Sequence, residues 1–262
     1  MVGQDVEPVV ASPTVRAGWR LSLYPDAGEA GGSVGGPLRR GPVVPRAEPD
    51  RERARAEAAR RARGQVRRYC AANRLNRLGT LTYEGTGCHD PGQLRDDVAM
   101  FFRTLRAGLG RGTFAYLWVA EWHKSGHGLH VHFAVGRFVE RWRIEQAWGR
   151  GFVHIKLLGD LPVGSGVMAE ARKAAGYLSK YVTKTFEGEG DGDATRRIAG
   201  LHRYEVAQGF QPATIRFTGR RYEDVVAAAC EHMGGGLPEY VWRSWEQEGW
   251  IAPPAVWVQW RG

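Results

Sequence analysis

Two short segments carry most of the side chains that could do chemistry. Residues 121–133 read Glu-Trp-His-Lys-Ser-Gly-His-Gly-Leu-His-Val-His-Phe, and residues 177–184 read Tyr-Leu-Ser-Lys-Tyr-Val-Thr-Lys. The first segment predicts a β-hairpin that can hold a divalent metal, and the second predicts a helix that presents tyrosines and lysines. A metal beside a tyrosine hydroxyl, in a chain of net charge +9, indicates phosphoryl transfer on DNA.

The hairpin offers three metal ligands. Side chains alternate along a strand, so His130 and His132 point to one face while Val131 points to the core. The short turn brings Glu121 of the preceding strand within reach of His130. Two imidazoles and one carboxylate leave open positions for phosphate oxygens and water, which suits Mn²⁺ or Mg²⁺. The alternative is that both histidines are ordinary solvent-facing residues of a sheet.

Two further histidines lie near this hairpin. His123 could be a fourth ligand or a DNA contact, whereas we interpret His127 as a residue of the turn.

The helix places two phenols together. Tyr177 and Tyr181 are four residues apart and therefore share one helix face, which Lys180 and Lys184 flank. Tyrosine has a pKa near 10 and is a poor nucleophile at pH 7 unless a metal or an ammonium group stabilises the phenolate. A phosphotyrosine bond would conserve the energy needed to rejoin DNA. The alternative is that the rings pack into the core and the lysines extend into solvent.

Hydrophobic periodicity predicts the elements that position these segments. Strands are expected at 77–83, 114–123, 129–135 and 151–158, and helices at 94–109, 139–149 and 167–185. The order β-α-β-β-α-β, followed by a helix, predicts an α+β fold. Its antiparallel sheet has the split βαβ topology of ferredoxin-like and RNA-recognition folds, with helices on one face.

Composition divides the rest of the chain. We expect residues 1–50 to be a disordered Gly/Pro-rich arm and residues 187–200 an acidic, glycine-rich linker. Residues 69–186 form the domain that carries both motifs, and 201–262 form a C-terminal helical, tryptophan-rich segment. Residues 51–68 predict a basic helix. Its candidate DNA-binding residues are Arg60, Arg61, Arg63, Arg67 and Arg68.

The bulk composition narrows the class of partner. A net charge of +9 over 262 residues implies a polyanion, with nucleic acid the first choice. No apolar run approaches the roughly 20 residues of a membrane span, so no membrane partner is expected. The three cysteines are widely spaced and form no disulfide framework, which suits a reducing cytoplasm. No ATP-binding phosphate loop is present.

Three motifs, in order, resemble the HUH endonuclease superfamily. Leu-Gly-Thr-Leu-Thr-Tyr at 78–83 is similar to its first strand motif, and Gly-Leu-His-Val-His-Phe at 128–133 to its histidine–hydrophobic–histidine strand. Ala-Gly-Tyr-Leu-Ser-Lys-Tyr-Val-Thr-Lys at 175–184 looks like the two-tyrosine motif of its phage-type members. The resemblance spans about residues 67–185. It is closest to replication initiators of rolling-circle plasmids and small single-stranded DNA phages.

This resemblance implies a mechanism. Glu121, His130 and His132 would bind the metal, and one tyrosine would attack single-stranded origin DNA to leave a 5′-phosphotyrosine and a free 3′-hydroxyl. That end would prime the host polymerase, and a host helicase would unwind the duplex. The second tyrosine would make the next cut, and Lys180 would stabilise the phosphate or the leaving oxygen. Which tyrosine acts first stays open.

Two other functions are compatible with the same residues. A transposase or relaxase of a mobile element would use the same chemistry on different DNA ends. A non-catalytic nucleic-acid-binding protein would instead use the sheet as an aromatic platform, and would have no task for paired tyrosines.

Overall fold

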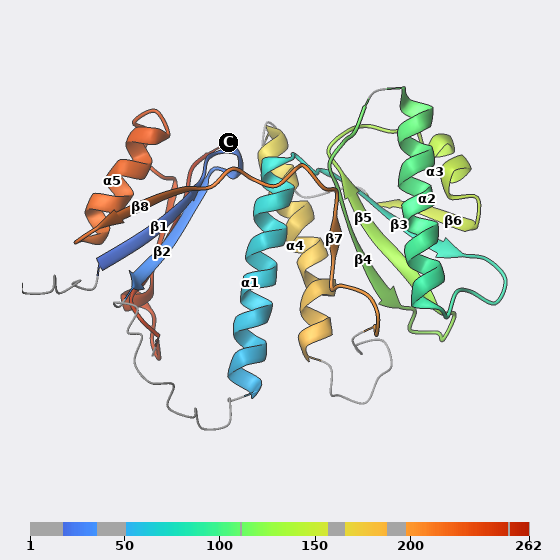
Figure 1. Ribbon diagram of the computed structural model, residues 1–262, viewed down its shortest axis with the longest axis horizontal. Coiled ribbons are helices and arrows are strands. Elements are labelled where there is room, and N and C mark those ends of the chain that lie inside the picture. The colour runs from blue at the N-terminus through green and yellow to red at the C-terminus, as the bar shows by residue number, and fades with distance from the viewer. Residues whose placement is uncertain are drawn as a thin grey trace, which may run out of the picture.

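The computed structural model describes residues 18–35, 51–110, 112–156, 166–187, 198–250 and 252–261. They form two five-stranded antiparallel sheets. Two long helices, α1 (Arg51–Ala72) and α4 (Gly166–Glu187), lie side by side between the sheets (Figure 1).

One sheet contains both candidate motifs. Its strand order is β6-β3-β5-β4-β7. The bounds are β3 (Arg77–Tyr83), β4 (Tyr116–Trp122), β5 (Leu129–Val135), β6 (Gly151–Lys156) and β7 (Glu205–Val206). Helix α2 (Pro91–Leu109) joins β3 to β4, and α3 (Arg141–Trp148) joins β5 to β6. The order of elements and strands confirms the predicted split βαβ topology.

Helices cover this sheet on both faces. The crossover helices α2 and α3 share one face, as predicted, and pack Phe101 and Trp148 against Phe133 of β5. Helices α1 and α4 cover the other face, where Leu117 and Leu178 belong to a second apolar core. The expectation of helices on one face therefore holds only for the crossover helices. Apolar residues on both faces need burial, and this requires two layers of helix.

The second sheet joins the two ends of the chain. Its order is β8-β1-β2-β10-β9, and α5 (Tyr222–His232) covers one face. The bounds are β1 (Gly18–Tyr24), β2 (Glu29–Gly35), β8 (Ile215–Gly219), β9 (Tyr240–Arg243) and β10 (Ala255–Gln259), and η1 (Pro25–Ala27) connects β1 to β2.

The expectation of a disordered arm is wrong for residues 18–35. Trp19, Leu21 and Leu23 alternate along β1 and are buried beneath α5. The glycines of β2 permit close strand packing, since a Cβ on Gly32 would lie 2.1 Å from the Arg20 carbonyl oxygen. The residues that cover this hairpin come from 215–260, so the N-terminal segment shows no core of its own. Residues 1–17 and 36–50 lie outside the described residues.

The C-terminal boundaries also differ from expectation. Strand β7 adds to the sheet of the central domain by pairing with Leu117 and Trp118. The tryptophan-rich segment that follows builds the second sheet with β1 and β2, instead of completing the core of the central domain. Of the predicted linker, residues 188–197 lie outside the described residues.

Deleting residues 1–35 should unfold the second sheet. The deletion removes two adjacent inner strands and the buried Trp19, Leu21 and Leu23. Each such side chain contributes about 1.5–3 kcal/mol, and the whole stability of a domain is about 5–15 kcal/mol. We expect hydrogen exchange to show loss of amide protection at 215–260. Deleting only residues 1–15 is the control, and equal protection at 215–260 in both truncations would contradict the prediction.

Candidate metal and tyrosine site

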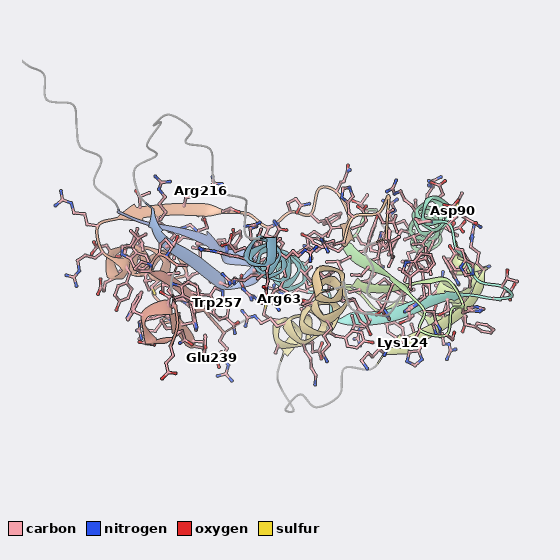
Figure 2. All side chains as sticks on the ribbon, turned by 90° about the horizontal axis from the view of Figure 1, so that it is seen from below. Arg63, Asp90, Lys124, Arg216, Glu239 and Trp257 are labelled. Atoms are coloured by element: carbon pink, nitrogen blue, oxygen red, sulfur yellow. The ribbon has the colours of Figure 1, made fainter. Side chains whose placement is uncertain are left out.

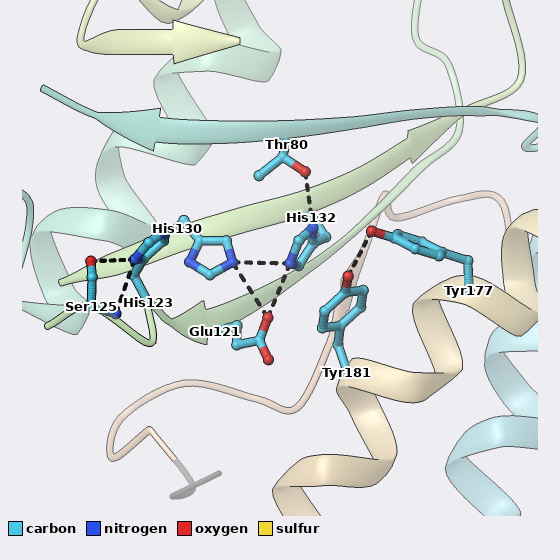
Figure 3. Close-up of polar contacts among 8 residues, drawn as sticks. All are labelled: Thr80, Glu121, His123, Ser125, His130, His132, Tyr177 and Tyr181. Atoms are coloured by element: carbon cyan, nitrogen blue, oxygen red, sulfur yellow. Dashed lines mark hydrogen bonds and ion pairs between the residues drawn. The ribbon is translucent and has the colours of Figure 1, made fainter. Parts of the chain in front are cut away.

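Glu121, His130 and His132 converge on one face of the central sheet (Figure 3). Glu121 and His130 are direct cross-strand partners in the β4–β5 register. The Glu121 carboxylate Oε2 lies 3.2 Å from His132 Nε2 and 3.4 Å from His130 Nε2. The two Nε2 atoms are 3.0 Å apart. Both imidazoles are buried, so the donor atoms meet in a partly desolvated position.

These separations fit a small divalent cation. Ligand bonds of about 2.1 Å place neighbouring donors about 3.0 Å apart at right angles and about 3.4 Å apart at tetrahedral angles. His132 Nδ1 lies 3.0 Å from Thr80 Oγ1, and donation from Nδ1–H to that oxygen leaves the Nε2 lone pair facing the site. The three residues that the sequence predicts as ligands are therefore brought together in a suitable arrangement.

Both tyrosines lie directly beside this triad. The Tyr181 ring stacks on His132, with centroids 3.8 Å apart and planes 20° apart. The Tyr177 ring centre lies 6.2 Å from that of His132. The Tyr181 hydroxyl donates a hydrogen bond of 2.6 Å to the Tyr177 hydroxyl. Their spacing on α4 predicts a shared face, and the packing of α4 on the sheet brings that face to the histidines (Figure 3).

The surroundings of Tyr181 favour the neutral phenol. Burial raises its pKa above the ordinary value, and the hydrogen bond to Tyr177 and the nearby Glu121 carboxylate raise it further. A bound cation would oppose the effect of Glu121, because it neutralises that carboxylate and attracts a phenolate. The phenol is therefore held in reserve until positive charge is present beside it.

The lysines are placed differently from expectation. Lys180 is exposed on α4, and Lys184 belongs to the same helix but its side chain lies outside those described. The sequence analysis missed Lys156, whose Nζ lies 4.7 Å from the centre of the Tyr177 ring. Strand alternation could have found it, since the register places Lys156 opposite Leu78, whose neighbour two residues on, Thr80, pairs with His132.

The other histidines of the hairpin have local partners. His123 Nδ1 lies 2.6 Å from Ser125 Oγ, and its ring centre is 5.4 Å from that of His130. His123 lies beside the three-residue cluster and outside it. His127 Nε2 lies 2.9 Å from the Tyr83 carbonyl oxygen, which fits its predicted place in the turn.

An exposed aromatic strip continues from the triad toward the edge of the sheet. Glu121, His130, Thr82 and Phe152 form one cross-strand row, from β4 to the edge strand β6. Phe152 is 68% exposed, which is unusual for a phenylalanine within a strand. His154, the next residue on the same face of β6, is also exposed.

The arginines of α1 fall into two groups. Arg60, Arg61 and Arg63 are exposed, in keeping with a role in binding a polyanion. Arg67 makes two hydrogen bonds to the buried Glu29 carboxylate, and Arg68 lies 3.5 Å from the same group. These ion pairs attach α1 to the second sheet. We therefore leave Arg67 and Arg68 out of the proposed DNA-binding set.

The fold and the site define an antiparallel α+β domain with a candidate metal triad beside two tyrosines. Residues 76–186 match the family model for replication-associated proteins of the ORF2 type, over a stretch that runs from β3 into the last turn of α4. The match supports a replication-associated family for this domain. No curated protein and no solved structure matches the chain. Among the described residues, no helix has both the length and the apolar composition that a membrane-spanning segment requires.

Proposed function

We propose that this protein initiates rolling-circle DNA replication by cutting one DNA strand at a specific site and later rejoining it, as an HUH-type endonuclease. The observation that supports this most is the pair of hydrogen-bonded tyrosine hydroxyls next to the Glu121–His130–His132 triad. The replication-associated family match over the same residues supports the biological process.

The triad residues would hold Mn²⁺ or Mg²⁺. When bound, the ion supplies Lewis-acid stabilisation of the scissile phosphate and lowers the cost of ionising a nearby phenol. One tyrosine oxygen attacks phosphorus, so the Tyr O–P bond forms while the bond from phosphorus to the 3′ oxygen breaks. The phenolic proton leaves and the 3′ oxygen gains one, which gives a 5′-phosphotyrosine and a 3′-hydroxyl that host polymerase can extend.

The second tyrosine has a role after one round of synthesis. Its hydroxyl lies 2.6 Å from the first, so both oxygens can reach the same phosphate-binding position in turn. It cuts the regenerated site, and the released 3′-hydroxyl attacks the first phosphotyrosine to join the ends. Each exchange conserves the number of phosphodiester bonds and needs no ATP.

Positive side chains around the tyrosines would hold the phosphate backbone. Lys156 lies against Tyr177, and we propose it alongside Lys180 and Lys184 as a phosphate contact. The exposed arginines of α1, Arg60, Arg61 and Arg63, would contribute at longer range. Because the reaction would depend on host helicase and polymerase, we expect it to occur in the cytoplasm.

Phe152→Ala should weaken binding of the cleavable strand without abolishing chemistry. The exposed ring lies in the same cross-strand row as His130 and can stack on a base beside the scissile phosphate. Base stacking contributes about 1–3 kcal/mol, so KM should rise on the order of 5–150-fold while kcat changes little. Single-turnover cleavage across DNA concentrations measures both. Phe152→Trp should retain the affinity, while Phe138→Ala, at another exposed phenylalanine, is the control. An unchanged KM for Phe152→Ala would contradict this contact.

A covalent-adduct assay tests the proposed function. The protein is incubated with Mn²⁺ and a pool of single strands covering the replicon that encodes it, and the products are separated in SDS. We expect a slow band that resists SDS and depends on metal. Strand binding without any such band would overturn the proposal and favour a non-catalytic nucleic-acid-binding protein.

A further inference from the structure

The second sheet presents an arginine-rich half on the face opposite α5. Trp19, Leu21 and Leu23 point toward α5, so the intervening residues of β1 point away from it. The register extends this face onto neighbouring strands, because Arg20 pairs with Thr218 and Ser22 pairs with Arg216. Arg20, Thr218 and Arg216 are exposed. Arg20 and Arg216 are diagonal cross-strand neighbours, about 7–8 Å apart at the backbone.

The other half of the same face is aromatic. Trp257 pairs with Trp242 across β10 and β9, and Gln259 pairs with Tyr240, which is 50% exposed. The Tyr240 and Trp257 rings are 5.5 Å apart, and Trp242 contacts Trp250 edge-to-face at 5.3 Å. Aromatic surface therefore continues from the centre of the sheet to its β9 edge.

Helix α1 adds positive charge beside the aromatic half. The Arg67 guanidinium lies 4.7 Å from the centre of the Trp257 ring, and that of Arg60 lies 5.8 Å from the Trp250 ring. Arg63, on the same helix, is exposed (Figure 2). Arginine side chains from segments about 150 residues apart in sequence thus gather around one sheet face.

Negative charge on this face is neutralised. Among the described strand residues that point away from α5, the single carboxylate is Glu29, which is 1% exposed and bound by Arg67 and Arg68. Exposed charge from the described strands of this face is therefore positive. An arrangement of arginines on one side and aromatic rings on the other matches a DNA strand, whose phosphates and bases lie on opposite sides of its sugar backbone.

We propose that this face is a second binding surface for single-stranded DNA, distinct from the site of cleavage. Phosphates contact Arg20 and Arg216, while bases lie against Tyr240 and Trp242. Helices α1 and α4 separate this face from the triad (Figure 1), so the bound segment flanks the cleaved one. The inference rests on the proposed function for the identity of the strand, but binding here requires no cleavage.

The test measures binding without cleavage. Fluorescence anisotropy of oligo(dT) of about 40 nucleotides, in chelator, gives Kd at several salt concentrations for the full chain. For Arg20→Gln/Arg216→Gln we expect Kd to rise on the order of tenfold at low salt. The slope of log affinity against log salt should fall by about 1.4, since each lost phosphate contact removes about 0.7. Arg20→Lys/Arg216→Lys should retain the wild-type slope. Arg103→Gln, an exposed arginine of α2, is the matched control.

Each alternative outcome overturns the inference. An unchanged slope for the glutamine pair would show that these arginines are only solvated. A lysine pair as weak as the glutamine pair would assign them a structural role, and an effect on duplex DNA alone would overturn the single-stranded assignment. Failure of the adduct assay leaves this result interpretable, because oligo(dT) binding in chelator depends on neither tyrosine nor metal.

Discussion

Replacing Tyr177 and Tyr181 together with phenylalanine should abolish the covalent protein–DNA adduct. The variant keeps both rings, and therefore the stacking of residue 181 on His132, but it removes both hydroxyls. Loss of a nucleophile typically reduces the rate of such reactions by about 10⁴-fold or more. Quantified SDS-resistant product per enzyme, on a cleavable single strand with Mn²⁺, gives the measurement.

The single variants separate the two roles. Each should still form an adduct on a simple strand if its remaining hydroxyl can reach the phosphate, while rejoining after a second cut should require both tyrosines. Tyr204→Phe is the matched control, because its hydroxyl bonds to Gln65 of α1, away from the triad. Adduct formation by the double variant at the wild-type rate would assign the nucleophile to another residue. Retained DNA affinity in the double variant would show that the loss is chemical.

The second large effect is expected at the metal. His130→Ala removes one of three ligands, and should weaken Mn²⁺ binding and reduce cleavage by at least about 10³-fold, since metal activation of phosphate and phenol is lost. His130 is the better choice for this test, because His132 also supports the ring of Tyr181. Calorimetric titration with Mn²⁺ measures binding independently of activity.

The control for this variant lies on the same face of the sheet. His154→Ala removes an exposed imidazole of β6, which pairs with Thr80 and lies outside the triad. It should leave Mn²⁺ affinity unchanged. If His130→Ala and wild type bind Mn²⁺ equally, or if cleavage proceeds in excess chelator, the triad has a structural role and the metal-dependent mechanism is wrong.

Local periodicity was enough to determine the central fold and the identity of the candidate ligands. Alternation along a strand places His130 and His132 together, and a spacing of four on a helix places Tyr177 and Tyr181 together. These relationships follow from backbone geometry within a few residues. The β-α-β-β-α-β order follows in the same way from the change of hydrophobic period along the chain.

Contacts between distant segments were decided only by the tertiary structure. The docking of α4 on the sheet stacks Tyr181 on His132, and the β6 edge brings Lys156 to Tyr177. Glu29 binds Arg67 across 38 residues, which removes that arginine from the predicted DNA contacts. In each case the partner lies on another element, so the spacing of residues within one segment carries no information about it.

The N-terminal hairpin shows the same limit most clearly. Gly31 and Gly32 make its sequence look unable to fold, because glycine contributes no side chain to a core. The structure buries Trp19 and its neighbours with α5 and β10, from the opposite end of the chain. Composition reports what a segment can bury by itself. The sequence therefore determined the chemistry and the central fold, whereas long-range burial decided which remote segments complete each sheet and which charges remain free to bind DNA.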